Sequence, residues 1–216
     1  MKLALYLDTS LCGFGFVLKD LEGQHQLLHR EVDFSSKASS FKLSSCLEKA
    51  LNKLKASQSD IKCVIVSKGP GSFTGIRIGL SWAKGFCLAS QERKLFAVSS
   101  LECLAAYLGK INQLDSLSVL LSNTKTTGFV ADYSVSKPTK LFFLDDKSEL
   151  EEPCSLFVDS FYGNIKEEFT RQVLSKVEMA SFALEAMVDS LAHSASWRDL
   201  EGDLDCEPLY LRRSSV

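Results

Sequence analysis

The chain has 216 residues, of which 45% are hydrophobic and 24% are charged, and its formal net charge is −2. This near-neutral balance excludes a global attraction to nucleic acid or to an anionic membrane. No apolar run approaches the roughly 18 residues that span a bilayer. Asp8 also interrupts the N-terminal apolar stretch too early for a signal sequence. We therefore expect a cytoplasmic protein without a membrane segment.

The cysteines agree with that location. There are seven of them, an odd number, and none is spaced as Cys-x-x-Cys. Cys63, Cys87 and Cys103 stand among apolar residues. This usage is typical of reduced thiols that serve as small core side chains.

The first third of the chain predicts three strands and a helix. Short apolar runs at 3–8, 14–19 and 26–34 are separated by turn-like segments. Leu3, Leu5 and Leu7 alternate with other apolar residues, which is typical of a central strand buried on both faces. From about 38 to 56, leucines and alanines recur at spacings of three and four, so we expect an amphipathic helix there.

The next segment predicts two strand-to-helix units. An apolar strand at 63–67 leads through a glycine-rich loop into a helix at 76–89. A second strand at 95–98 is followed by a helix at 101–108, which the serines at 99–100 can cap. The predicted order of this first part is βββαβαβα.

The second half repeats the theme less clearly. We expect strands at 118–122, 129–135, 141–144 and 155–158, and helices at 165–174 and 181–193. A last apolar piece, Pro208-Leu209-Tyr210-Leu211, precedes a polar tail. The expected organisation is an N-terminal lobe at 1–110 and a smaller, divergent C-terminal lobe at 111–216.

The most informative segment is 69–80, which reads Gly-Pro-Gly-Ser-Phe-Thr-Gly-Ile-Arg-Ile-Gly-Leu. A strand that turns through glycines into a helix presents backbone N–H groups to an anion or a partner. The segment is neither a Walker A loop nor a Gly-x-Gly-x-x-Gly motif. A tight structural turn therefore remains as open an interpretation as an anion site. The candidate loop and anion-site residues are Asp8, Thr9, Ser10, Gly69, Gly71, Ser72, Thr74, Gly75 and Arg77.

The helix at 76–89 is apolar on most of its circumference, whereas a surface helix buries one stripe. We therefore expect that it is either sandwiched inside the domain or in contact with another chain. One predicted face carries Ile76, Leu80, Ala83 and Cys87, and the other carries Ile78, Trp82, Phe86 and Ala89. The candidate partner-interface residues are Ile76, Ile78, Gly79, Leu80, Trp82, Ala83, Phe86 and Cys87.

Other chemistries find less support. His25 and His29 are four residues apart, a spacing that lets two histidines on a helix bind one metal ion. They fall in a predicted strand, however, where four residues span about 13 Å, too far for one ion. His193 stands alone on a predicted helix, so we expect neither a metal site nor a nucleophile–base dyad. The segment 62–94 is locally basic, which favours either an anionic substrate or, more simply, solvated charges.

Asp8-Thr9-Ser10 after the first strand resembles the first phosphate loop of the actin-like ATPase superfamily. That superfamily also uses a Gly-Gly adenosine motif, and this chain contains no Gly-Gly pair. Asp8-Thr9-Ser10, the segment 67–79, Val98-Ser99-Ser100-Leu101-Glu102 and the segment 208–212 together resemble the bacterial TsaB (YeaZ) family. The resemblance is close over residues 1–108 and thin afterwards. At 121–128 the chain lacks the Asp-Ala-Arg sequence that the family often carries.

This resemblance implies an actin-like (ribonuclease H-like) two-lobed α/β fold and a role in tRNA modification. TsaD, with TsaB, TsaE and TsaC, installs threonylcarbamoyl on the adenosine beside the anticodon of tRNAs that read ANN codons. The resemblance implies a scaffold without catalytic residues or a metal, which pairs with TsaD through first-lobe helices and forms homodimers in isolation. It also implies that tRNA is met only through the complex, and that ATP or ADP binds, if at all, at the joint with TsaD.

Two enzymatic alternatives remain open. One is an actin-like ATPase or phosphotransferase that uses Asp8, and the other, from old family naming, is a metallopeptidase. For the scaffold, we expect that Gly79→Arg or Ala83→Glu breaks the complex while the monomer stays folded.

Overall fold

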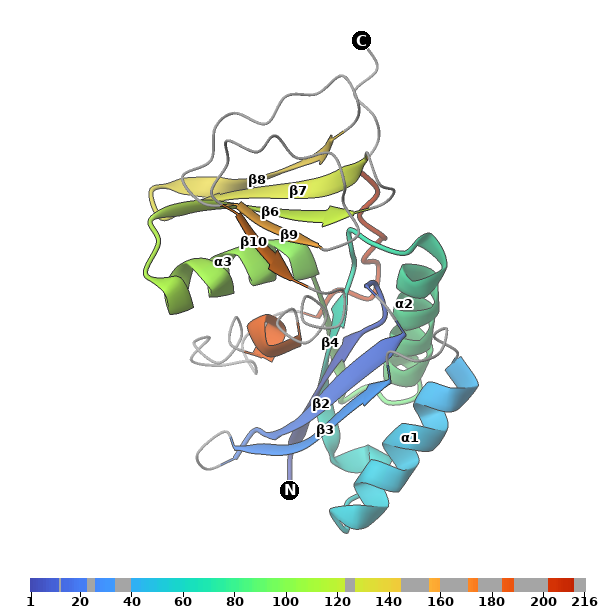
Figure 1. Cartoon of the computed structure of the whole chain (residues 1–216). Coiled ribbons are helices and arrows are strands. Elements are labelled where there is room, and N and C mark those ends of the chain that lie inside the picture. Colours follow the sequence, from blue (N-terminus) through green and yellow to red (C-terminus); the bar gives the residue numbers. More distant parts are fainter. Residues whose placement is uncertain are drawn as a thin grey trace.

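The computed structural model describes residues 1–11, 13–22, 26–33, 40–122, 127–144, 156–159, 171–174, 184–188 and 202–211. The described helices include none that is long and apolar enough to cross a bilayer. Two five-stranded sheets form the framework, and Figure 1 shows them as separate layers with helices packed against them.

The first sheet has the order β3-β2-β1-β4-β5. Its strands are β1 (Leu3–Asp8), β2 (Phe14–Asp20), β3 (Leu27–Asp33), β4 (Ile61–Ser67) and β5 (Lys94–Val98). β1 pairs antiparallel with β2 and parallel with β4, so it occupies the centre of the sheet. This placement explains why every residue of β1 is buried.

Two helices cover one face of this sheet, α1 (Ser40–Lys53) and α2 (Phe73–Leu88) (Figure 1). The core between these helices and the sheet contains Leu3, Leu5 and Leu7 of β1 together with leucines of α1 such as Leu43 and Leu47. The alternate residues of β1, Ala4 and Tyr6, face the other side and pack with the short helical segment 184–188. The alternating residues of β1 are therefore buried on both faces of the sheet.

The second sheet has the order β10-β9-β6-β7-β8. Its strands are β6 (Ser116–Ser122), β7 (Gly128–Ser134), β8 (Lys137–Leu144), β9 (Leu156–Asp159) and β10 (Arg171–Leu174). The central strand β6 again pairs antiparallel with the strand that follows it and parallel with the third strand after it in the chain. The second sheet thus repeats the order of the first, with shorter final strands. The helix α3 (Ser100–Asn112) packs on β6 and β7 and buries Leu101, Leu104 and Leu108.

The predicted order βββαβαβα is confirmed, and Ser99 caps α3 by accepting a hydrogen bond from the Glu102 N–H at 3.2 Å. The helix predicted at 165–174 is wrong where it can be compared, because 171–174 form β10 in parallel pairing with β9. Pairing with a neighbouring strand overrides local propensity in such short segments. The rest of that prediction, and most of the helix predicted at 181–193, lie outside the described residues; 184–188 are helical.

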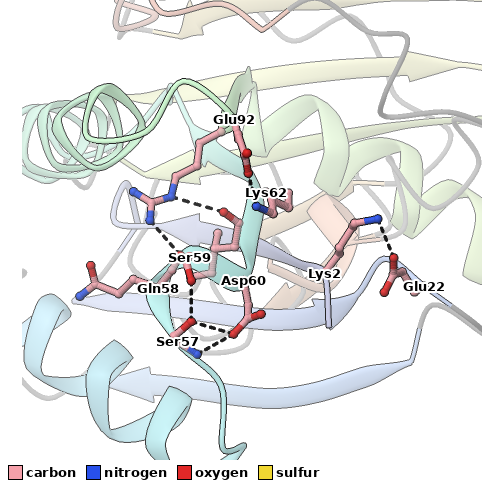
Figure 2. A network of polar contacts seen from close by, with 10 residues as sticks. Lys2, Glu22, Ser57, Gln58, Ser59, Asp60, Lys62 and Glu92 are labelled. Atoms are coloured by element: carbon pink, nitrogen blue, oxygen red, sulfur yellow. Dashed lines mark hydrogen bonds and ion pairs between the residues drawn. The ribbon is translucent and has the colours of Figure 1, made fainter.

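A network of polar contacts stabilises the start of β4, as Figure 2 shows. The short 3₁₀ helix η1 (Gln58–Asp60) precedes this strand, and the Asp60 carboxylate accepts hydrogen bonds from the backbone N–H and hydroxyl of Ser57, both at 2.8 Å. The Lys62 ammonium pairs with Glu92. Arg93 donates to the carbonyls of Gln58 and Phe86, at 2.8 and 2.6 Å, and so ties the last turn of α2 to this corner.

Candidate partner-docking surface beside the glycine loop

The glycine loop between β4 and α2 packs directly against the end of β1. A Cβ added at Gly75 would lie 2.0 Å from the Thr9 carbonyl oxygen, and one at Gly71 would lie 2.2 Å from that of Ser10. The Ser72 N–H donates to the Ser10 carbonyl at 2.5 Å, and the Thr9 hydroxyl donates to the Gly75 carbonyl at 2.7 Å. These contacts require glycine for close backbone approach. Segments 8–10 and 69–75, which the sequence singled out separately, therefore form one packed unit.

The start of the loop is fastened by the C-terminal segment 202–211, which we call the strap. The Leu209 N–H donates to the Lys68 carbonyl at 2.7 Å, and the Asp203 N–H donates to the Leu95 carbonyl at 2.8 Å. Gly69 has φ +100°, and a side chain there would collide with Ile76 of α2. The peptide bond between Gly69 and Pro70 is cis. The strap thus contacts the same loop that begins α2.

Asp8 lies beneath this loop and is almost completely buried. One carboxylate oxygen accepts hydrogen bonds from the backbone N–H and hydroxyl of Ser10, at 2.6 and 2.7 Å. Among the described residues, its other oxygen has no hydrogen-bond partner. Burial raises the pKa of Asp8, and the two hydrogen bonds from Ser10 oppose that rise. The Ser10 hydroxyl also lies 3.1 Å from that of Ser67 and 3.2 Å from that of Ser100, so the cluster joins β1, β4 and α3.

A pocket remains at the mouth of this packed unit. It has a volume of about 280 Å³ and is lined by Thr9, Leu11, Gly13, Ser72, Thr74, Gly75 and Ile78. Ser72 caps α2 by accepting a hydrogen bond from the Gly75 N–H at 3.2 Å. The pocket therefore brings together Thr9, Ser72, Thr74 and Gly75 of the candidate anion-site residues. Asp8, Ser10, Gly69, Gly71 and Arg77 do not line it, and anion binding here stays a prediction.

One face of α2 belongs to the core. Ile76, Leu80, Ala83 and Cys87 are buried against the first sheet. Gly79 is buried too, and a Cβ there would lie 2.2 Å from the Thr9 hydroxyl oxygen. Gly79→Arg and Ala83→Glu would thus place charged side chains in the core of the monomer. The expectation that these two changes spare the fold is wrong, because both sites pack inside the chain.

The opposite face of α2 is open to solvent. Thr74, Ser81, Gly85 and Leu88 are exposed, Ile78 is half-buried, and no heavy atom lies within 4 Å of a Cβ added at Gly85. These five residues share one side of the helix, because their spacings are three and four. We call them the α2 outer face. Of its members, only Ile78 is among the interface residues predicted from the sequence. Thr74, Ser81 and Gly85 have small or no side chains and give no apolar signal, and Leu88 is not among the predicted residues.

Two predicted interface residues lie at the edge of this face. The Trp82 indole N–H donates to the Ser44 hydroxyl of α1 at 2.8 Å, and its ring stacks on that of Phe86 at 4.9 Å between centroids. The Arg93 guanidinium lies 4.1 Å from the Phe86 ring centroid. Both rings are therefore partly covered by the chain itself, and the Trp82–Ser44 hydrogen bond helps to hold α2 against α1.

An arginine–aromatic cluster lies on the other edge of the outer face. The Arg77 guanidinium lies 3.7 Å from the Phe73 ring centroid, and its Nε donates to the Tyr210 hydroxyl at 2.9 Å. The two rings are 5.2 Å apart between centroids. Arg77 and the 208–212 segment are each notable in the sequence, but residues 133 positions apart give no local signal of contact.

The histidines add no catalytic constellation among the described residues. His29 lies on β3, where its Nε2 is 3.3 Å from a Glu31 carboxylate oxygen. His25 and His193 lie outside the described residues. Within the described part of the chain, no group of three or more histidine, cysteine or acidic side chains is placed to hold a metal.

Two sheets with the same strand order, each with helices packed on it, define an actin-like (ribonuclease H-like) α/β fold, as the sequence predicted. Solved structures show the same fold: YeaZ from Pseudomonas aeruginosa superposes with a TM-score of 0.71 at 18% identity, covering 98% of this chain and 100% of that one. A second Pseudomonas aeruginosa structure, described as similar to peptidase YEAZ, superposes with a TM-score of 0.72 at 19% identity over the same shares of both chains.

Sequence comparison identifies the family. Residues 33–142 match the model of the family described as "TsaD: tRNA N6-adenosine threonylcarbamoyltransferase". The chain belongs to this family, and within it the resemblance to TsaB (YeaZ) proteins is confirmed by the names of curated relatives.

Two of these relatives are named tRNA threonylcarbamoyladenosine biosynthesis protein TsaB. The protein from Buchnera aphidicola subsp. Baizongia pistaciae is 26% identical over 61% of this chain, and the one from Bacillus subtilis is 33% identical over 47%. The matched segments span 62% and 43% of the lengths of these two relatives.

Proposed function

We propose that this chain is a TsaB-like subunit of the machinery that makes threonylcarbamoyladenosine in tRNA, and that it acts as a docking scaffold without a catalytic residue of its own. It pairs with TsaD, and TsaE joins the complex. The tRNA is met through the complex, and an adenine nucleotide has its place at the joint with TsaD. The single observation that carries the scaffold role is the α2 outer face.

Three features of that face support a partner helix as its occupant. Its central side chains, Thr74, Ser81 and Gly85, are small, which allows close approach of another helix backbone. Leu88 is 72% exposed and Ile78 lies on the same side, so apolar area is available for burial. The helix contains Arg77 and Lys84 but no acidic residue, so it complements an acidic surface better than a second copy of itself.

The cysteines of the first sheet and α2 support the non-catalytic part of the proposal. Burial raises the pKa of the Cys63 thiol to about 12 and that of Cys87 to about 11. A thiol of such high pKa is not a nucleophile at neutral pH, because the thiolate is the reactive form. Asp8 is likewise buried below the loop and does not line the pocket at its mouth.

Docking is tested with Gly85→Arg. The new side chain extends into open space in the isolated chain, so its thermal midpoint should stay close to that of the wild type, whereas pairing with TsaD should fall at least about hundredfold. Val135→Arg is the matched control, because Val135 is 68% exposed beside the second sheet. Isothermal calorimetry measures the pairing, and equal affinities for both variants would show that α2 is not the docking element.

The cellular role is tested separately by depletion. Cells depleted of the protein should lose threonylcarbamoyladenosine from tRNA, and Val135→Arg but not Gly85→Arg should restore it. Mass spectrometry of digested tRNA measures the nucleoside. Unchanged levels after depletion would reject the role in tRNA modification and favour a homodimeric binding module of another kind.

A further inference from the structure

The Arg77 side chain is exposed, yet two neighbouring aromatic side chains hold its guanidinium group in place. Its guanidinium stacks over Phe73 at 3.7 Å from the ring centroid, and its Nε donates to the Tyr210 hydroxyl at 2.9 Å. An arginine side chain has five N–H donors, and this bond uses one of them. Among the described residues, no carboxylate forms an ion pair with Arg77. The group is therefore ordered before any partner arrives, with donors left over.

We infer that Arg77 is the carboxylate-binding group of the docking surface, and that Tyr210 of the strap is its positioning residue. The inference rests on the proposed function, since the carboxylate belongs to an aspartate or glutamate on the partner helix. Guanidinium groups bind carboxylates through parallel N–H donors in a fixed plane. Stacking on Phe73 and the bond to Tyr210 fix that plane beforehand, which lowers the ordering cost of binding.

The location of Arg77 links it to the docking surface. It precedes Ile78 and lies four residues before Ser81 and after Phe73, so it borders the α2 outer face on the side away from α1. Phe73, at the start of α2, and Tyr210 of the strap are 54% and 42% exposed, and they add apolar area beside the outer face. A partner helix on the outer face would therefore reach Arg77 at its margin.

A protein carboxylate fits this site better than an RNA phosphate. The strap that supplies Tyr210 also carries Asp203, Asp205 and Glu207, all of which are exposed. A run of phosphates carries more negative charge than a single carboxylate, so these like charges would repel it more strongly. The overall charge of −2 gives no general attraction to a polyanion.

The test measures affinity for TsaD against salt concentration. Arg77→Gln should weaken pairing by about tenfold to hundredfold and flatten its salt dependence, because a charge-assisted bond is lost. Arg77→Lys keeps the charge and the salt dependence but not the planar fork, so the affinity should remain about tenfold below that of the wild type. Tyr210→Phe keeps the ring and the arginine, and should weaken pairing by about threefold to tenfold without flattening the salt dependence.

Lys140→Gln is the matched control, since it removes one positive charge from an exposed site on β8. It should leave both the affinity and the salt dependence unchanged. Thermal unfolding of each variant alone checks the fold.

The outcomes separate the two proposals. A wild-type chain that does not pair with TsaD would overturn the proposed function and this inference together. Wild-type pairing that Arg77→Gln leaves unchanged would overturn only the inference. Loss of binding to a tRNA transcript by the isolated Arg77→Gln chain, with pairing intact, would assign the arginine to a phosphate instead.

Discussion

Asp8 places a carboxyl group inside the protein at the end of β1, where Ser10 supplies both of the hydrogen bonds that it accepts. The resemblance to actin-like ATPases implies an aspartate at this point that holds a metal or water, but here the carboxyl group is almost completely buried. Burial raises the pKa of Asp8 because its charged form loses hydration. The residue therefore weakens the folded state whenever it must ionise inside it.

Asp8→Asn should consequently stabilise the protein at neutral and alkaline pH. The raised pKa means that the stability linked to Asp8 is complete below the ordinary carboxyl range and is lost as the pH rises through the folded-state value. Asparagine keeps an acceptor for Ser10 and does not ionise, so its advantage should shrink toward pH 4. Urea unfolding of both proteins from pH 4 to 8 measures this. A variant that is less stable than the wild type at pH 8 would contradict it.

At the scale of the element, α2 shows how one helix serves two surfaces. Its inner face fills the core with Ile76, Leu80 and Ala83, and its outer face carries small and apolar side chains exposed to solvent. The predominance of apolar residues around the whole of α2 thus has two causes. The inner residues hold the helix on the sheet, and the outer ones are available to a partner.

A glycine-to-alanine substitution should change the stability of the chain in opposite directions on the two faces of α2. Gly79→Ala should destabilise the isolated chain by about 1–3 kcal/mol, because its methyl group meets the Thr9 hydroxyl, which is held by the Gly75 carbonyl. Gly85→Ala should stabilise it by about 0.5–1 kcal/mol, since alanine favours a helix and the site is open. Urea denaturation of both variants checks this, and equal signs would mean that the helix packs differently.

At the scale of the whole molecule, the glycine loop, the strap and the start of α2 meet at the carboxyl ends of β1 and β4, two inner strands of the first sheet. The loop glycines allow close contact with Thr9 and Ser10, and a pocket of about 280 Å³ remains at the mouth of the loop. The division into lobes at residue 110 stays a prediction. The descriptions of relatives and neighbours include a peptidase, but 18–19% identity carries only the fold.

Because the chain contains no Gly-Gly adenosine motif, we expect that the isolated chain does not bind ATP with magnesium in the micromolar range. Titration calorimetry should show no saturable heat, whereas the pair with TsaD should show binding at the joint. Micromolar binding and hydrolysis by the isolated chain, lost in Asp8→Ala, would instead support the actin-like ATPase alternative. The wild-type and variant thermal midpoints serve as the folding control.

The order of strands and helices in residues 1–112 could be predicted from the sequence, because β1, α1 and α2 carry clear apolar periods and the serines at 99–100 mark the start of α3. The start of α2 was less clear, because the helix begins at Phe73, three residues before the predicted start. The sequence also marked the family through the glycine loop. Local patterns did not reveal β10, which depends on its pairing with β9.

The exposed side of α2 is known only from the folded arrangement, because periodicity separates two faces of a helix but does not say which one meets the sheet. The folded arrangement also shows that Gly79 and Ala83 are core positions, and that Arg77 meets Tyr210 across 133 residues. Contacts between distant segments leave no trace in local spacing. The sequence of the glycine loop therefore indicates the family. The packing of Thr9, the strap and α2 around the loop leaves exposed the surface that we propose for docking.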